Sequence, residues 1–338
     1  MKYYSLNNIL KLKSDFNFII GQRANGKSYA VKKYILNDYK KTGNKFVMIR
    51  RYATDVKKQF IERYFSDFLI SEYVENATFI TMRAGVIYAA TREKNKVVLL
   101  KEIGYCLALN NQIKYKSMAF NDVKTIVFEE FNANDYLPME VSEFFNLYST
   151  INRAKNEVRC FFIGNAVTKF NPYVVAFNLI DAMRDMKHGD IKQYTVNNVT
   201  IAVEYCKIVK SIQEKTPEFL QKNINEGEYF YGRKFLTKGI YKRSKLIFEY
   251  YRKCGDIWLI DQALIYSDKI YFFIYPYTGK PRKRIVNEKT ILYNTHKTLL
   301  DSNANFKKLN NLYRNDENLF FSDGDTAAIY ELYNGGLT

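Results

Sequence analysis

The sequence is poor in the residues that build metal centres and covalent cross-links. Its 338 residues include four cysteines, two histidines and five prolines. No two cysteines are close enough for a C-x-x-C motif, and a disulfide framework is typical of much shorter secreted chains. We therefore expect neither a zinc site nor disulfides, with the cysteines acting as small buried apolar residues. The cysteines and histidines are Cys106, Cys160, Cys206, Cys254, His188 and His296.

Long apolar runs are also missing. Charged residues interrupt every apolar stretch before it reaches about 18 residues, the length that a membrane-spanning helix needs. The first residues, MKYYSLNNILKLK, lack the apolar stretch and small-residue cleavage site of a secretory signal peptide. These absences predict a soluble protein that stays in the compartment where it is made and has no membrane partner.

Acidic residues are outnumbered by basic ones. The 52 Lys and Arg residues and 35 Asp and Glu residues give a formal net charge of +17. Such a surplus indicates a polyanionic partner, and nucleic acid is the first candidate. A basic protein of the membrane surface is the second, but no segment supports it. Because 47% of the residues are hydrophobic, the chain has enough apolar material for folded cores.

The chain length predicts two domains. We expect a first domain over residues 1–197, a linker over 198–230, where no periodicity is clear, and a second domain over 231–338. Short apolar runs that end in acidic or polar residues are typical of a parallel sheet covered on both faces. In the first domain these runs are residues 16–20, 45–49, 97–100, 125–128 and 160–163, together with a helix over 26–39 and a hairpin formed by 78–81 and 86–90.

Aromatic strands follow one another closely in the second domain. Residues 245–250, 257–261 and 270–275 alternate with turn residues, which predicts an α+β domain with a mostly antiparallel sheet. The same region is strongly basic, because residues 231–289 hold 14 basic and 5 acidic side chains.

A phosphate-binding motif lies near the start of the chain, where residues 21–28 read GQRANGKS and match G-x-x-x-x-G-K-S. Glycines of this pattern let backbone N–H groups approach phosphate oxygens at the N-terminus of a helix. We expect Lys27 to reach the β- and γ-phosphates and Ser28 to hold Mg²⁺. The alternative is a glycine turn before an amphipathic helix. The predicted nucleotide-binding residues are Gly21, Gln22, Arg23, Ala24, Asn25, Gly26, Lys27 and Ser28.

A protein with such a phosphate-binding loop needs a second strand that ends in carboxylates, which hold the metal and activate the attacking water. Residues 125–130, TIVFEE, are the best match. Adjacent side chains at a strand end point in different directions, which suits two roles. We assign Glu129 to the metal side and Glu130 to the general base. The first acid is usually Asp, and Glu129 is one methylene longer. The alternative is a solvated acidic turn.

Three further polar residues have positions that suit catalysis. Asn165 follows the strand expected at 160–163, where it can orient the attacking water, although a Gly-Asn turn is the alternative. Arg153 and Lys116 lie in polar stretches before the third strand and before the acid-bearing strand. An arginine or lysine that reaches a neighbour's nucleotide supplies positive charge to the transition state, whereas a single arginine is more commonly a solvated surface charge.

Five segments together resemble one known family, the compact DNA-packaging ATPases of small Bacillus-type podophages with protein-primed linear genomes. The RRY after the second strand and the NAV and NPY after the third are the most particular of these signals. The segments are NFIIGQRANGKSYA (17–30), MIRRY (48–52), KTIVFEEF (124–131), FFNLYSTINR (144–153) and VRCFFIGNAVTKFNPY (158–173).

The resemblance implies an additional-strand P-loop NTPase fold of the RecA, FtsK and terminase type, followed by an RNase H-like domain that has lost nuclease activity. It places Glu130 as the catalytic carboxylate, Asn165 as a sensor, and Arg153 and Lys116 as residues that act on the adjacent subunit's ATP. It further implies Mg²⁺, double-stranded DNA, and a ring of five subunits at the capsid portal in the host cytoplasm. Some members of the family also dock on a structured phage RNA.

Basic clusters are the candidate DNA contacts. Glu249, Asp256 and Asp261 show no paired spacing, and metal-dependent nucleases need several convergent carboxylates, so we expect no live nuclease. The basic residues suit contacts to a phosphate backbone, with solvated faces as the alternative. The predicted DNA-binding residues are Lys57, Lys58, Arg233, Lys234, Lys242, Arg243, Lys245, Arg282, Lys283 and Arg284.

Three classes of function compete. The first is a ring ATPase that pumps duplex DNA, with other P-loop translocases and helicases as its relatives. The second is a small GTPase or nucleoside kinase, which the absence of an N-K-x-D motif and the charge of +17 disfavour. The third is a non-enzymatic DNA-binding or capsid protein with a decayed P-loop, which the intact Lys27, Ser28 and Glu130 disfavour.

Overall fold

The computed structural model divides the chain into two compact units. One comprises Met1–Ala166 and Lys187–Pro217, and the other comprises Val167–Met186 and Glu218–Thr338. The structure describes residues 3–22, 24–132, 136–137, 139–153, 157–165, 171–177, 179, 183, 186–207, 234–235, 243–254, 257–266, 269–277, 319–322, 326–327 and 329–330.

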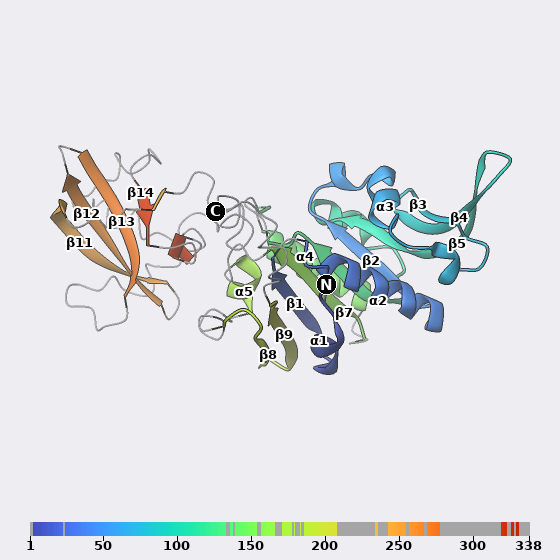
Figure 1. Ribbon diagram of the computed structural model, residues 1–338, viewed down its shortest axis with the longest axis horizontal. Coiled ribbons are helices and arrows are strands. Elements are labelled where there is room, and N and C mark those ends of the chain that lie inside the picture. Colours follow the sequence, from blue (N-terminus) through green and yellow to red (C-terminus); the bar gives the residue numbers. More distant parts are fainter. Residues whose placement is uncertain are drawn as a thin grey trace. The chain divides into compact units, whose positions relative to one another are not determined.

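A sheet of nine strands, in the order β3-β4-β5-β2-β6-β7-β1-β9-β8, organises the first unit (Figure 1). Its six central strands, in the order β5-β2-β6-β7-β1-β9, pair in parallel. The strands β3, β4 and β8 add antiparallel pairs at the two edges. The strands are β1 (Phe16–Gly21), β2 (Lys45–Arg50), β3 (Phe79–Arg83), β4 (Val86–Glu93), β5 (Lys96–Ala108), β6 (Val123–Glu129), β7 (Arg159–Asn165), β8 (Ile191–Val196) and β9 (Val199–Tyr205). This mixed α/β architecture confirms the predicted fold class.

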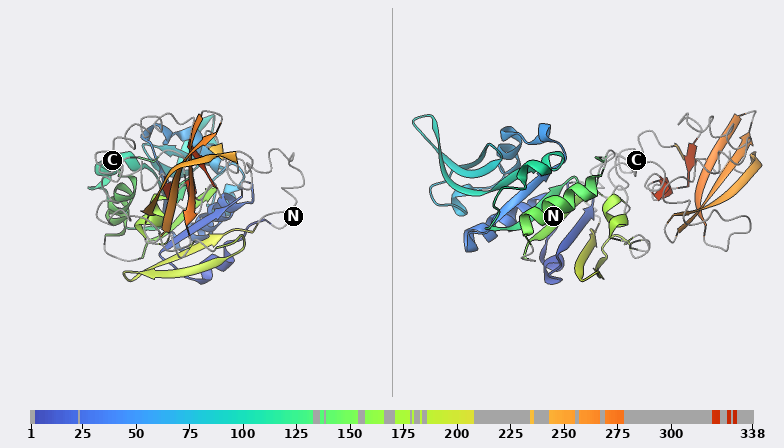
Figure 2. Two further views of the ribbon diagram at one scale, coloured as in Figure 1. Left: turned by 90° about the vertical axis from the view of Figure 1, so that its left-hand side faces the viewer. Right: turned by 180° about the vertical axis from the view of Figure 1, so that it is seen from behind.

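Helices cover both faces of this sheet, as the continuous apolar strands require. Val31, Ile35 and Leu36 of α2 pack on the face formed by residues such as Val127 and Phe161. Their neighbours along the strands, such as Phe128 and Phe162, point to the opposite face, where α4 supplies Phe144. Figure 2 shows α4 lying across this second face. The helices of the first unit are α1 (Asn7–Lys11), α2 (Lys27–Thr42), α3 (Lys58–Tyr64) and α4 (Glu140–Asn152), with 3₁₀ turns η1 (Ala53–Asp55), η2 (Ile70–Glu72) and η3 (Leu109–Tyr115), whereas α5 (Pro172–Ala176) belongs to the second unit.

The second unit contains a sheet in the order β10-β14-β13-β12-β11. The antiparallel pairs β11–β12 and β12–β13 contain the three predicted aromatic strands, while β14 and β10 add parallel pairs. The strands are β10 (Lys234–Phe235), β11 (Lys245–Cys254), β12 (Ile257–Tyr266), β13 (Lys269–Tyr277) and β14 (Leu319–Phe321). The RNase H-like character of this unit stays a prediction.

The expected linker over residues 198–230 begins too early, because β9 belongs to the first sheet. β9 pairs in parallel with β1 and forms an antiparallel hairpin with β8. Asn197 and Asn198 connect the hairpin with positive φ angles of 50° and 65°, a conformation that asparagine tolerates well. The boundary expected at residue 197 therefore lies inside the first unit, and residues 208–230 lie outside the described residues.

The strand expected at residues 97–100 is the first part of a longer strand. β5 runs over 13 residues, pairing antiparallel with β4 and, from Gly104 onward, parallel with β2. Its first half is exposed or half-buried, which explains why only its most apolar residues stand out in the sequence.

None of the helices among the described residues is long and apolar enough to cross a membrane.

Gly104 offers a test of the register between β5 and β2. A Cβ atom at this position would collide with the carbonyl oxygen of Phe46 and lie 3.2 Å from two ring carbons of the same residue. We expect Gly104→Ala to lower the free energy of unfolding by about 1–3 kcal/mol, measured by urea denaturation.

Gly43→Asn is the matched control. Gly43 has a φ of 75°, and a Cβ atom placed there would meet nothing within 4 Å, so asparagine should change stability by less than about 1 kcal/mol. Equal stability of the Gly104→Ala variant and wild type would contradict the register described here.

Candidate functional site

Three parallel strands bring the predicted site residues to one edge of the first sheet. β1 ends at Gly21, β6 at Glu129 and β7 at Asn165. The register pairs Gly21 with Asn165 and Glu129 with Ile163, so the three strand ends lie side by side. The structure thus brings together the P-loop, the acidic pair and Asn165.

The P-loop joins β1 to α2 through a left-handed turn. Gly26 caps α2 with φ 95° and ψ 10°, and Ala24 also has a positive φ, of 59°. The Lys27 ammonium donates to the carbonyl oxygens of Gly21 at 2.9 Å and Gln22 at 2.7 Å, and to Asn25 Oδ1 at 3.2 Å. Arg23 lies outside the described residues. The buried lysine is therefore held by oxygen acceptors inside the loop, which phosphate oxygens can replace.

Burial disfavours the charged form of Lys27. It lowers the pKa of the ammonium to about 8, against the opposing influence of Cys206 and Glu129. A ligand with negative charge would offset this cost of burial.

Close packing explains why Gly21 has no side chain. A Cβ atom there would lie 2.6 Å from the Cβ atom of Cys206. Cys206 follows β9, and its backbone N–H donates to the carbonyl of Ile20 at 2.7 Å. Any larger residue would separate β9 from the start of the P-loop. Cys106, Cys160 and Cys206 are all buried, as expected for small apolar residues.

The two adjacent glutamates have different surroundings. Glu129 is half-buried, and its Oε1 atom is enclosed without a hydrogen-bond partner among the described residues. Burial raises the pKa of this carboxyl, while the nearby hydroxyls of Ser28 and Tyr64 lower it. Glu130 has a φ of 54° and a side chain that is 73% exposed, with Oε2 3.7 Å from Arg50 Nη2.

Ser28 and Glu129 could hold a magnesium ion. An enclosed carboxylate oxygen without a partner, next to a hydroxyl at the start of the P-loop helix, suits a hard cation that prefers oxygen ligands. Among the described residues there is no cluster of three His, Cys, Asp or Glu side chains. Two protein ligands are typical of Mg²⁺ sites in which phosphates and waters complete the coordination.

Asn165 is connected to the acidic loop through Asn132. The side-chain amide of Asn132 donates to the carbonyl oxygen of Asn165 at 3.2 Å. At Gly164, a Cβ atom would lie only 2.7 Å from a ring carbon of Phe131, so the two loops are in close contact. The end of β7 is therefore packed against the residues that follow Glu130.

The structure does not bring Arg153 and Lys116 to the P-loop of the same chain. Arg153 ends α4 with a φ of 43°, and its guanidinium donates to the carbonyl of Met118 at 2.5 Å. Lys116 follows η3 and is exposed. α4 packs against η3, so these two basic residues belong to the same region of the unit.

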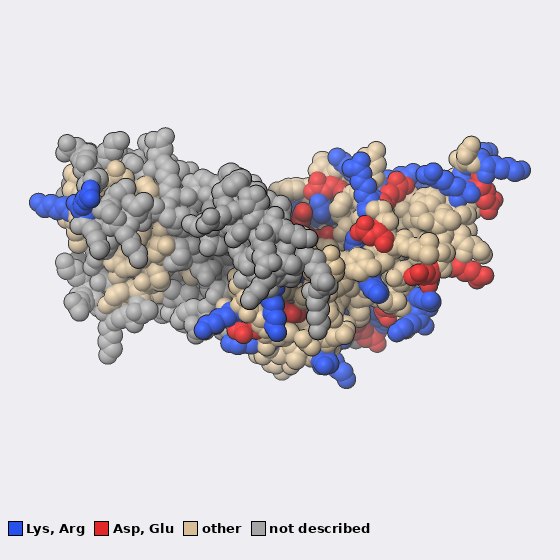
Figure 3. Space-filling model, in the orientation of Figure 1, with Lys and Arg blue, Asp and Glu red and all other residues tan. Residues whose placement is uncertain are grey.

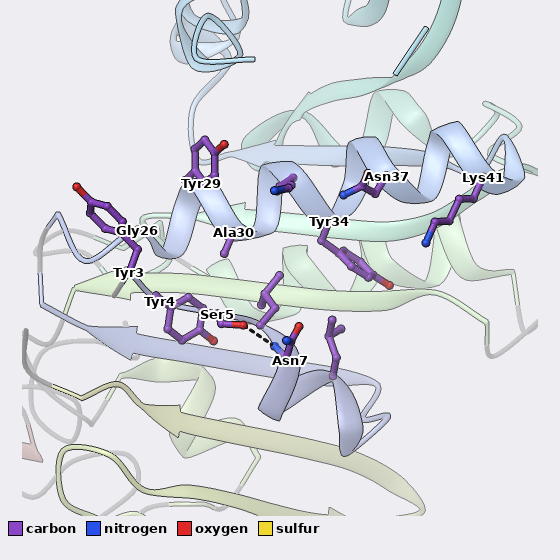
Figure 4. A pocket seen from close by; sticks show the side chains of 13 residues that line it. Tyr3, Tyr4, Ser5, Asn7, Gly26, Tyr29, Ala30, Tyr34, Asn37 and Lys41 are labelled. Carbon is purple, nitrogen blue, oxygen red and sulfur yellow. Dashed lines mark hydrogen bonds between the residues drawn. The ribbon is translucent and has the colours of Figure 1, made fainter. Parts of the chain in front are cut away.

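A cavity of about 810 Å³ lies beside the P-loop and was not expected from the sequence. Figure 4 shows Tyr3, Tyr29 and Tyr34 around it, between the N-terminal segment and α2. The backbone N–H of Tyr4 donates to the carbonyl of Asn25 at 2.9 Å, and its hydroxyl donates to Glu204 Oε2 at 2.6 Å. The four tyrosines near the motif are the sequence feature that could have indicated this cavity. Aromatic walls next to a phosphate loop suit a nucleotide base.

The predicted DNA contacts are only partly described. Lys57 and Lys58 are exposed at the start of α3, where Lys58 Nζ lies 3.6 Å from Glu62 Oε1. Arg243 and Lys245 are exposed, and Lys234 lies in β10. Arg233, Lys242, Arg282, Lys283 and Arg284 lie outside the described residues, as does Asp256. Figure 3 shows Lys and Arg side chains over the β4–β5 hairpin as well, which are not among the predicted DNA contacts.

Known proteins similar to this chain are phage DNA-packaging proteins. The DNA packaging proteins of Bacillus phage phi29 and Bacillus phage B103 are 34% identical to it, over 182 and 168 residues. The phi29 match covers 53% of this chain and 51% of the relative, and the B103 match covers 48% of each. The chain thus spans about half the length of the relatives it matches.

One solved structure supports the fold, and a second is similar in sequence. A chain of the bacteriophage Phi-29 viral genome packaging motor assembly is 23% identical, with 98% of both chains covered and a TM-score of 0.56. The N-terminal domain of the phi29 DNA packaging ATPase is 30% identical over 60% of this chain and 95% of that domain, with a TM-score of 0.48.

A family model extends the match along most of the sequence. The model of the podovirus DNA encapsidation protein (Gp16) matches residues 1–280. The resemblance inferred from the five sequence segments is thereby confirmed. The chain belongs to the podovirus DNA encapsidation protein (Gp16) family.

Proposed function

We propose that this protein is an ATPase whose subunits form a ring and move double-stranded DNA through the portal into a preformed capsid. The observation that carries the proposal is that the catalytic groups proposed for this protein lie in two separate places in the first unit. The P-loop and Glu130 lie at one edge of the sheet, whereas Arg153 lies at the far end of α4. Such a site needs a second subunit. The family membership and the names of the relatives support the role in packaging.

The nucleotide is ATP bound with Mg²⁺. Lys27 and the backbone of residues 21–26 bind the phosphates, and Ser28 and Glu129 bind the metal. The tyrosine-lined cavity holds the base, with Tyr3 and Tyr29 near the P-loop glycine Gly26. When bound, Mg²⁺ polarises the phosphate oxygens.

Glu130 is the general base for the attacking water. Its exposed carboxylate can approach a water molecule outside the strand edge, whereas the enclosed Glu129 cannot. The Glu130 Oε2 atom lies 3.7 Å from Arg50 Nη2, which places the carboxylate near the end of β2. Asn165 orients the same water from the end of β7.

Arg153 acts on the nucleotide of a neighbouring subunit. α4 begins beside the strand ends that carry the site, and its 13 residues span about 20 Å before Arg153. β7 then begins at Arg159, at the edge opposite the P-loop. This distance exceeds the reach of an arginine side chain. Arg153 and Lys116 therefore supply positive charge across a subunit interface, where it stabilises the transferred phosphoryl group.

DNA binds through its phosphate backbone. Packaging must ignore sequence, so the contacts are electrostatic and come from exposed lysines and arginines. Lys57 and Lys58 serve this role in the first unit, and the basic residues that begin with Arg233 serve it in the second. The ring has five subunits, acts at the portal vertex in the host cytoplasm, and can include a structured phage RNA.

A helicase or another P-loop translocase is the second candidate, because it would use the same site. It would separate the strands of a DNA duplex, which a packaging motor leaves paired. A non-enzymatic capsid protein would bind DNA without hydrolysing ATP.

Mixed rings test the division of the active site. We expect Glu130→Gln and Arg153→Ala each to lower DNA-stimulated ATP turnover by about a hundredfold or more. A mixture of the two should recover activity, because one pairing joins an intact Glu130 to an intact Arg153. Steady-state ATPase assays with duplex DNA measure this. A mixture as inactive as either variant would mean that Arg153 acts within its own chain.

The salt dependence of DNA binding tests the lysines of α3. The logarithm of the DNA affinity falls with the logarithm of salt concentration by about 0.9 for each phosphate contact. Removing Lys57 and Lys58 together should therefore make this slope shallower by about 2, measured by fluorescence anisotropy with duplex DNA. Lys94→Ala with Lys96→Ala, at the tip of the β4–β5 hairpin, is the charge-matched control. The assignment is wrong if both double variants give the wild-type slope.

A further inference from the structure

Arg51 makes an unusually complete set of contacts at the end of β2. Its Nε donates to Glu140 Oε2 at 2.6 Å and its Nη2 to Glu140 Oε1 at 2.9 Å. The same guanidinium donates from Nη1 to the carbonyl oxygen of Glu130 at 3.1 Å and from Nη2 to that of Phe131 at 2.9 Å. Only a planar fork with several donors can reach these acceptors at once. A lysine cannot replace it.

The ion pair is largely hidden from solvent. The side chains of Arg51 and Glu140 are 10% and 1% exposed. The rings of Phe128 and Tyr136 flank the guanidinium, with centroids 5.5 and 5.4 Å from Cζ. A buried ion pair adds little net stability compared with apolar residues of similar size. Its geometry therefore points to positioning rather than to stability.

The contacts of Arg51 continue to the end of β7. The hydroxyl of Tyr136 donates to Asn132 Oδ1 at 3.1 Å, and the amide of Asn132 donates to the carbonyl of Asn165 at 3.2 Å. The backbone of residues 130–132 is thus attached to β2 on one side and to β7 on the other. This backbone determines where the Glu130 carboxylate lies.

Glu140 connects the same contacts to α4. It is the first residue of the helix, and its Oε2 accepts the backbone N–H of Leu137 at 2.9 Å. Phe144, Leu147 and Ile151 are buried along the helix, so the core holds it over its whole length. Arg153 is its C-terminal cap. One helix therefore has the Arg51 contact at its start and the candidate arginine finger at its end.

We propose that Arg51 is a positioning residue that fixes Glu130 for the subunit's own ATP and, through Glu140 and α4, fixes Arg153 for its neighbour's ATP. The inference rests on the proposed function. Because one guanidinium holds both the loop and the helix, a shift of the loop that carries Glu130 also shifts Arg153. Each subunit thereby couples its own site to the next.

The first experiment compares turnover with nucleotide affinity in the full-length protein with duplex DNA. We expect Arg51→Lys and Glu140→Gln to lower kcat by about tenfold to a hundredfold, because small displacements of catalytic groups have effects of this size. The dissociation constant for a fluorescent ADP should change by less than about threefold, since the P-loop is untouched. Arg92→Lys, on the hairpin, and Glu157→Gln, in the partly exposed ion pair with Lys124, are matched controls that should retain wild-type turnover.

The second experiment uses mixed rings and separates the two roles of Arg51. Arg51→Lys mixed with Arg153→Ala should recover much less activity than Glu130→Gln mixed with Arg153→Ala. The Glu130→Gln subunit still presents a well-placed Arg153, whereas the Arg51→Lys subunit does not. Equal recovery in the two mixtures would overturn the connection through α4.

Other outcomes distinguish this inference from the proposed function. If Arg51→Lys keeps wild-type turnover while Glu130→Gln is inactive, the role of Arg51 is wrong and the proposed ATPase stands. If Arg51→Lys and Glu140→Gln lose nucleotide affinity in step with turnover, the pair only maintains the fold and the inference is overturned. If Glu130→Gln itself keeps full activity, the proposed function fails.

Discussion

Parallel hydrogen bonding of β1, β7 and β6 sends three strand ends to the same edge of the first sheet, and the candidate site depends on this constraint. The apolar residues of these strands alternate between two buried faces, so the register cannot slip without exposing them. α2 and α4 cover the two faces. The positions of the P-loop, the acidic pair and Asn165 follow from this packing.

The two adjacent acids at this edge have different surroundings, which suits the two different roles proposed for them. Glu129 has an unpartnered oxygen near Ser28, and burial raises the pKa of its carboxyl. These are the surroundings in which a cation is stabilising. Glu130, one residue further, turns out to solvent through a left-handed backbone conformation. The hydroxyls of Ser28 and Tyr64 lie near the Glu129 carboxyl and act against this rise in its pKa.

The sequence predicted the elements whose signals are local. The strand before Gly21, the helix after Gly26 and the acids after Phe128 are all contiguous patterns, and the structure has them at these positions. Asn197 and Asn198 form a hairpin turn at the boundary between the expected first domain and the expected linker, which a search for periodicity alone did not detect. The catalytic roles of the site residues stay predictions.

Contacts between distant residues explain what sequence reasoning missed. Arg51 and Glu140 are 89 positions apart, so no spacing rule links them, even though the RRY segment was recognisable. The tyrosine-lined cavity likewise combines the N-terminal segment with α2. Both features exist only once the sheet has brought their elements together.

The central claim is that one chain does not contain a complete catalytic site. ATP turnover per subunit, measured in the presence of duplex DNA across a wide range of protein concentration, tests it most directly. We expect negligible turnover at low concentration and a steep rise to a plateau as subunits associate, because Arg153 must come from a neighbour. Turnover that is constant over the whole range would contradict this claim.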